Sequence, residues 1–204
     1  MKTGNRTYKM RARAEAVEAT RERIARAAMS RFMTDPYDDV TIASVAADAG
    51  VSHQTVLNHF ESKEGLFMSA AEQFSGDIQE RRGRRPPDDV ESAVASLMDQ
   101  FEESGDGNVR LAVLDDRIEA VRLALESGRA LHQGWLTEIF ADRLPRGNAE
   151  RRRAVAALHA VTDVYTWKLL RRDLGLSRRV TQQTMTEMLT AIVDSWPQRE
   201  EKDR

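Results

Sequence analysis

The segment TIASVAADAGVSHQTVLNHF, residues 41–60, constrains the fold of this chain more than any other stretch. Apolar residues in its first half recur at the spacing of one helical face, and Thr41 precedes them as an N-cap residue. Gly50 stands where a helix end needs a left-handed residue, and Ser52 can cap a second short helix over residues 53–59. Two short helices joined by such a turn form a helix-turn-helix.

The second of these helices presents a polar face that contains no acid. Gln and Asn side chains can hydrogen-bond the edge of adenine, and Thr can meet a phosphate or a thymine methyl. The neighbouring helix starts, at Thr41 and at Ser62-Lys63, offer free N–H groups that favour phosphate. This pattern predicts a DNA-binding surface; the alternative interpretation is a helical hairpin whose polar residues only face water. The outward residues are Ser52, His53, Gln54, Thr55 and Asn58.

The rest of the chain predicts helices and no strand. Apolar steps of three and four indicate helices over residues 13–33, 63–82, 89–103, 148–174 and 177–196. Residues 109–144 are expected to divide near Asp115-Asp116, while residues 81–89 and the segment SGDGN at 104–108 are predicted loops. The expected fold is therefore all-α, with about nine helices. A three-helix helix-turn-helix domain covers residues 1–65 and is joined through a long fourth helix to a helical domain over residues 66–204.

Large and adaptable side chains on the middle helices favour a pocket for a small apolar or aromatic molecule. Each of them can equally belong to the core. Arg122, Arg129 and His132 are possible polar anchors for such a ligand. The candidate lining residues are Phe74, Met98, Phe101, Leu125, Arg129, His132, Trp135, Tyr165 and Trp167.

The last two predicted helices sustain their apolar steps over a long stretch, which favours a seam between two copies of the chain. The alternative is that the same stripe packs on the protein's own core. The predicted homodimer interface consists of Val155, Leu158, Thr162, Tyr165, Leu169, Met185, Met188 and Ile192.

The N-terminus carries basic side chains at Lys2, Arg6, Lys9, Arg11 and Arg13 and no acid within the first 13 residues. Such an arm is a local electrostatic footprint that suits nucleic acid. A solubilising, disordered tail would have the same composition, and the sequence leaves both interpretations open.

Several functional classes find no support in the residues. The chain contains no Cys, which excludes disulfides and thiolate metal sites. His53 and His59 have no carboxylate at ligand spacing, so neither a metal nor a cofactor is expected. No catalytic fingerprint occurs, so no enzymatic activity is expected. No apolar run approaches the ~18 residues of a membrane span, and no secretory signal follows the basic N-terminus. The expected location is the cytoplasm.

The segment RIARAAMSRFMTDPYDDVTIASVAADAGVSHQTVLNHFESKEGLF, residues 23–67, strongly resembles the DNA-binding region of the tetracycline-repressor (TetR) family of bacterial transcriptional regulators. The shared features are the order and spacing of T-I-x-x-V-A, A-G-V-S, H-F and S-K-E-x-L-F. The resemblance implies a dimeric repressor that binds a partly palindromic DNA operator and releases it when a small-molecule effector enters the C-terminal domain. By the same resemblance, phosphates would be met by Thr41, Ser52, Thr55, His59 and Lys63, and bases would be read by His53, Gln54 and Asn58.

The chain departs from the family pattern at two positions. Leu57 stands where the family usually has a Tyr whose hydroxyl contacts phosphate, so one positioning contact cannot form. Pro36 stands where Gly is frequent, and because Pro cannot adopt a positive φ, the first helix must end by a different turn. The alternative to a regulator is therefore a helical ligand-binding or protein-interaction module that no longer binds DNA.

Overall fold

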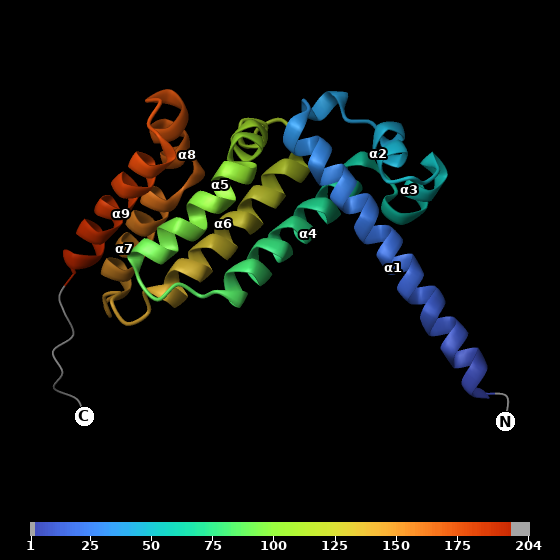
Figure 1. Cartoon of the computed structure of the whole chain (residues 1–204), viewed down its shortest axis with the longest axis horizontal. Coiled ribbons are helices and arrows are strands. Elements are labelled where there is room, and N and C mark those ends of the chain that lie inside the picture. Colours follow the sequence, from blue (N-terminus) through green and yellow to red (C-terminus); the bar gives the residue numbers. More distant parts are fainter. Residues whose placement is uncertain (1–2, 197–204) are drawn as a thin grey trace.

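The computed structural model describes the backbone of residues 3–196 and the side chains of residues 10–196. Over this range the chain is helical and contains no strand, which confirms the predicted all-α class. Figure 1 shows the first helices gathered at one end of the molecule and the last ones at the other, with α4, α5 and α6 running between them. The helices are α1 (Thr3–Thr34), α2 (Ile42–Asp48), α3 (His53–Phe60), α4 (Lys63–Arg84), α5 (Val90–Ala112), α6 (Glu119–Ile139), α7 (Asn148–Thr162), α8 (Val164–Lys168) and α9 (Arg178–Asp194), with a 3-10 turn η1 (Tyr37–Asp39) and a π-helical turn η2 (Leu169–Asp173).

An aromatic trio holds the N-terminal helices together. The ring of Phe32, at the end of α1, stacks on Tyr37 of η1 with centroids 5.2 Å apart, and it meets Phe67 of α4 edge-on at 5.0 Å. Offset and edge-on pairs of this kind stabilise a core beyond the area that they bury. This N-terminal core does not stop at α4, because Leu111 of α5 and Val121 of α6 are buried in it.

Every N-cap expected from a hydroxyl residue in the helix-turn-helix region is present. Gly50 has a φ of 64°, which confirms the predicted left-handed turn between α2 and α3. The caps satisfy N–H groups that have no partner inside the helix, and they fix where each helix begins. The backbone N–H of Ser44 donates to Thr41 at 3.0 Å, that of Thr55 to Ser52 at 3.1 Å, and that of Gly65 to Ser62 at 3.0 Å.

The segment SGDGN at 104–108 is not a loop, so that prediction was wrong. Helix α5 continues through it to Ala112, and the chain turns only at residues 113–117. The reason is close packing: a Cβ at Gly105 would lie 2.5 Å from the Trp167 ring, and one at Gly107 would lie 2.6 Å from the Met33 sulfur. Glycine is poor for helix stability, but here it allows two neighbours to approach the helix.

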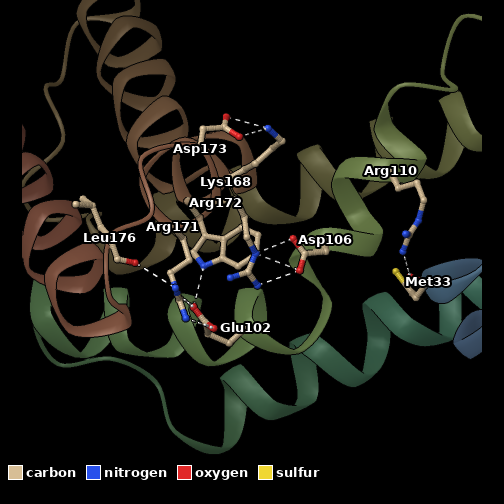
Figure 2. Close-up of polar contacts among 10 residues, drawn as sticks. Met33, Glu102, Asp106, Arg110, Lys168, Arg171, Arg172, Asp173 and Leu176 are labelled. Atoms are coloured by element: carbon tan, nitrogen blue, oxygen red, sulfur yellow. Dashed lines mark hydrogen bonds and ion pairs between the residues drawn. The ribbon is translucent and has the colours of Figure 1, made fainter.

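One face of α5 carries Glu102, Asp106 and Arg110, four residues apart, and connects the two ends of the molecule (Figure 2). Glu102 accepts from Arg171 at 2.8 Å and Asp106 accepts from Arg172 at 2.9 Å, so both carboxylates hold the η2 turn. At the other end, Arg110 donates to the backbone oxygen of Met33 at 2.5 Å. Helix α5 therefore contacts both the C-terminal helices and the end of α1.

Other predicted boundaries need correction. The helix expected over residues 148–174 breaks at Asp163, whose extended backbone (φ −76°, ψ 151°) lets its carboxylate accept from the N–H of Tyr165 at 2.8 Å. The loop expected at 81–89 begins later, because α4 continues to Arg84. Helix α1 begins at Thr3, so the backbone of most of the basic arm is helical. Lys2 lies outside the described residues.

The predicted break near Asp115-Asp116 is confirmed by the turn at 113–117. Between residues 3 and 196, no helix combines the length and the apolar character needed to cross a membrane.

We predict opposite effects of alanine at two helical glycines. Gly105→Ala should destabilise the protein by about 1–3 kcal/mol, since the new methyl group overlaps the buried Trp167 ring. Gly134→Ala is the matched control, because a Cβ added there, on the exposed side of α6, would meet nothing within 4 Å; it should stabilise by roughly 0.5–1 kcal/mol. Urea denaturation measures both, and equal effects would contradict the close packing of α5 on Trp167.

Candidate nucleic-acid interface and internal cavity

Helix α3 divides cleanly into a buried and an exposed face. Val56 and Phe60 are buried in the N-terminal core, while His53, Gln54 and Asn58 are exposed on the other side. The Gln54 side-chain amide donates to the Asn58 oxygen at 2.9 Å, so the two amides lie next to each other on this face. The predicted base-reading side chains are thus grouped on one accessible surface.

The hydroxyl residues expected at phosphates have structural bonds of their own. Thr41 and Ser52 are exposed N-caps, and the Ser52 and Thr55 hydroxyls lie 2.8 Å apart. A hydroxyl that accepts a backbone N–H keeps its own hydrogen and can still donate to a phosphate oxygen. Thr55 and His59 are only partly exposed. Their contacts with phosphate remain predictions.

Lys63 is less available than the sequence suggested. Its ammonium donates to the backbone oxygen of Tyr37 at 2.5 Å and lies 4.4 Å from the centre of the Tyr37 ring. Burial lowers the pKa of Lys63, with the nearby carboxylate of Asp38 acting in the opposite direction. In this structure Lys63 therefore closes the η1 turn, and a phosphate contact would require it to leave or share these bonds.

Sequence patterns missed the arginines of α1 that hold the helix-turn-helix in place. Arg21 donates to the backbone oxygen of His59 at 3.0 Å, and its guanidinium lies 4.7 Å from the Phe60 ring centre. Arg31 forms a two-pronged ion pair with Asp48 at the end of α2. These partners lie 17 or more residues apart in the chain, so no local pattern could pair them.

A cavity opens between α1, α4, α5, α6, the end of α7 and the start of α8. Its volume is about 200 Å³. Six of the predicted pocket residues line it: Phe74, Phe101, Leu125, Arg129, His132 and Tyr165. Whether an effector binds there remains a prediction.

Three of the predicted pocket residues do not line the cavity. Met98 and Trp167 are fully buried in the C-terminal core, because α5 packs on α8 and α9. Trp135 lies behind the cavity wall, beneath the guanidinium of Arg82 at 4.1 Å. Arg122 is also excluded as an anchor, since it pairs with Glu119 and Glu126 on the surface.

The end of the cavity away from α1 carries a cluster of polar side chains, in which the ring centres of His132 and His159 lie 5.1 Å apart. The Thr162 hydroxyl donates to the Leu158 oxygen at 2.7 Å, so it accepts from His132 Nε2 at 2.8 Å, and this places the proton of the neutral imidazole on Nε2. His159 Nε2 lies 3.2 Å from the Asp163 carboxylate. Burial and the charge of Arg82 lower the pKa of His132 to about 3.

Part of the predicted dimer seam is core. Leu158, Thr162 and Met185 are fully buried within the chain and cannot face a partner, since α7 packs on α6 and α9, and α9 also packs on α5. Val155 and Ile192 are partly buried against the same core. Tyr165, Leu169 and Met188 are exposed, together with Leu174, by 38% or more.

A capped helix-turn-helix on an all-helical body defines the class of helix-turn-helix transcriptional regulators. Residues 24–70 match the family described as "Bacterial regulatory proteins, tetR family". Over these residues the chain matches the N-terminal, DNA-binding region of TetR-type transcriptional regulators. It is 28% identical over 94 residues to an uncharacterized HTH-type transcriptional regulator, YerO, of Bacillus subtilis. That match covers 42% of this chain and 32%, about a third, of the relative.

Solved structures share the fold over most of the chain. A tetR-family transcriptional regulator from Streptomyces coelicolor superposes with a TM-score of 0.69 at 18% identity, covering 86% of this chain and 80% of that one. NalD of Pseudomonas aeruginosa, described as the secondary repressor of the MexAB-OprM multidrug efflux pump, superposes at 0.56 with 23% identity, covering 89% and 100%. At such identities the likeness concerns the fold alone.

We predict that His132 makes the fold sensitive to acid. Its folded pKa of about 3 lies below the ordinary value of 6.5, so the unfolded chain binds a proton that the folded chain excludes. Stability is fully present above pH 6.5 and declines as the pH falls toward 3, by at most about 1.4 kcal/mol per pH unit. Denaturant titrations at pH 7 and pH 5 should show a smaller loss for His132→Asn than for the wild type. An equal loss in both proteins would contradict the buried, neutral imidazole.

Proposed function

We propose that this protein is a cytoplasmic homodimeric repressor that binds a partly palindromic DNA operator and releases it when a small molecule occupies the internal cavity. The observation that carries the DNA-binding part is the exposed face of α3. Three side chains able to read base edges, His53, Gln54 and Asn58, lie together on a short helix that buried Val56 and Phe60 anchor to the core. No acid on that face opposes the phosphates.

Dimerisation supplies the second recognition helix. Two copies of α3 must be spaced by one turn of DNA, about 34–36 Å, to enter successive major grooves. The exposed apolar side chains Tyr165, Leu169, Leu174 and Met188 support a partner surface on the C-terminal helices, because exposed apolar patches mark association sites.

The cavity supports regulation by a ligand because its lining joins the two ends of the molecule. Met29 and Met33 of α1 and Phe67 of α4 form one end of it, and all three also belong to the N-terminal core. Different placements of α1 and α4 would set different distances between the two α3 helices of a dimer. A ligand that binds one placement more tightly favours that distance, and the size of the shift is set by the difference in affinity. NalD, a structural neighbour, is described as a repressor, and this favours repression over activation in the proposal.

A module that no longer binds DNA is the second candidate, favoured by two observations. Leu57 cannot make the family's usual phosphate contact, and Lys63 is already bonded to Tyr37. Selection of bound duplexes from random DNA separates the candidates: a recovered palindrome supports the repressor, and an absence of enrichment supports the module.

The same selection tests Gln54 as a base reader. Gln54→Ala should relax the preference at one position of each half-site, since a two-bond amide–adenine pair is worth about 1–3 kcal/mol. Gln183→Ala is the matched control, because Gln183 is also an exposed glutamine that donates to a side chain four residues on, but it lies on α9. The control should recover the wild-type site. An unchanged site for Gln54→Ala would remove Gln54 as a reader.

Leu169 tests the dimer. Leu169→Glu places a charge on a side chain that is 50% exposed, and a symmetric interface would carry that charge twice. The dimer dissociation constant should rise at least about tenfold, since each leucine contributes about 1.5–3 kcal/mol when buried. Sedimentation equilibrium measures it. Leu123→Glu on α6, where the leucine is 41% exposed, is the control and should leave the dimer intact; dissociation by both variants, or by neither, would contradict this surface.

A further inference from the structure

Arg82 is a cavity-lining cation without an acidic partner. One terminal nitrogen of its guanidinium donates to the side-chain oxygen of Gln100 at 2.7 Å, and the guanidinium lies over the Trp135 ring at 4.1 Å. Its Nε is buried and makes no hydrogen bond. No carboxylate of the described residues lies within 4.0 Å of it, whereas its neighbours Arg81 and Arg84 pair with Glu103 and Glu80.

The other charged groups of the cavity have partners of their own. Arg129 pairs with Asp115 at 3.8 Å, and the carboxylate of Asp163 lies 3.2 Å from His159. His132 is neutral at physiological pH, because burial and the charge of Arg82 lower its pKa to about 3. Among the described residues, Arg82 therefore has no ion-pair partner, and the carboxylate of Asp163 is directed to His159 and to the backbone N–H of Tyr165 instead.

A partly buried cation without an ion-pair partner is unfavourable in a protein, because it has lost part of its water without gaining a counter-charge. Burial and the neighbouring charge of Arg81 lower the pKa of Arg82 to about 10, which still leaves the guanidinium protonated at neutral pH. A protonated arginine without an ion-pair partner is suited to bind an anionic ligand. Guanidinium groups bind carboxylates through paired hydrogen bonds.

The remainder of the cavity is elongated and mostly apolar, with Ser75, Gln79 and Asn108 as further polar side chains of its lining. Its lining follows α4 from Phe67 to Arg82, which corresponds to roughly 22 Å along a helix. Opposite Arg82, the cavity ends at Met29, Met33 and Val121, beside α1. The Arg82 end thus holds Asp163 and the two histidines, while the α1 end is mostly apolar.

We propose that the cavity binds an organic anion, with a carboxylate head paired to Arg82 and an apolar body that extends toward α1. This inference rests on the proposed function, since it names the chemical class of the effector. The side-chain amide of Gln100, whose oxygen already accepts from Arg82, is placed to donate to the same carboxylate. A cationic ligand would be repelled by Arg82, and a neutral one would leave its charge unpaired.

Ligands with the same body and different heads test the proposal. Decanoate, decan-1-ol and decylamine share one chain and differ in charge, and naphthalene-2-carboxylate with naphthalene-2-methanol forms an aromatic pair. Isothermal titration of the full chain without DNA should show that at least one carboxylate binds about tenfold more tightly than its neutral analogue, as expected for hydrogen bonds to a charged group. Decylamine should bind most weakly of the decyl series.

Variants locate the preference at Arg82. Arg82→Gln should abolish the carboxylate preference while changing the affinity for the neutral analogues less than about threefold, and Arg82→Lys should retain part of it. Arg81→Gln is the matched control, because Arg81 is the adjacent arginine but is exposed and outside the cavity lining; it should behave as the wild type. Thermal unfolding without ligand establishes that each variant folds.

Two outcomes would overturn the proposal: wild-type protein that binds neither carboxylate more tightly than its neutral analogue, or Arg82→Gln protein that keeps the wild-type preference. Neither outcome depends on DNA. Failure of the proposed regulator would instead appear as an absence of enriched DNA sequences in the selection experiment, so the two failures are distinguishable.

Discussion

The contact between the end of α1 and helix α5 is the constraint on which the rest of this structure depends. Gly107 allows α5 to lie directly against Met33, and Arg110 fastens that contact by donating to the Met33 backbone oxygen. Arg117, in the turn after α5, pairs with Asp38 of the η1 turn at 2.8 Å. Because these bonds join the two ends of the molecule (Figure 1), the N-terminal core extends into α5 and α6 and the cavity opens beside α1.

The opposite end of α5 determines what the C-terminal helices present. Glu102 and Asp106 bind Arg171 and Arg172 and hold the η2 turn against α5 (Figure 2), while Trp167 fills the space above Gly105. With this turn fixed, Thr162 and Asp163 line the cavity and Leu169 faces outward. The break in the helix at Asp163 therefore separates side chains that line the cavity from a side chain on the exposed apolar surface.

The cavity and the helix-turn-helix share their supporting residues. Met29, Met33 and Phe67 line the cavity and also pack in the core that carries α2 and α3. Arg21 and Arg31 on α1 then hold those two helices by bonds to His59 and Asp48. A ligand body at the α1 end would thus touch the same helices that position the exposed polar face of α3. Through these shared residues, a bound ligand could change the position of α2 and α3. It would do so only if it bound one placement of α1 and α4 more tightly than another.

The sequence alone determined the local features of this protein. Hydroxyl caps, Gly50 and the apolar spacing of α2 and α3 act within a few residues, so they predicted the helix-turn-helix and its exposed polar face correctly. Tertiary structure decided the rest. It made a helix of SGDGN, because packing against Met33 and Trp167 outweighs the low helix propensity of glycine. It also placed Arg82 beside Trp135 and Gln100, which lie 53 and 18 residues away in the chain. A periodic pattern in the sequence does not show which side chains of distant helices meet. The position of the Arg82 charge in the cavity was therefore visible only in the tertiary structure.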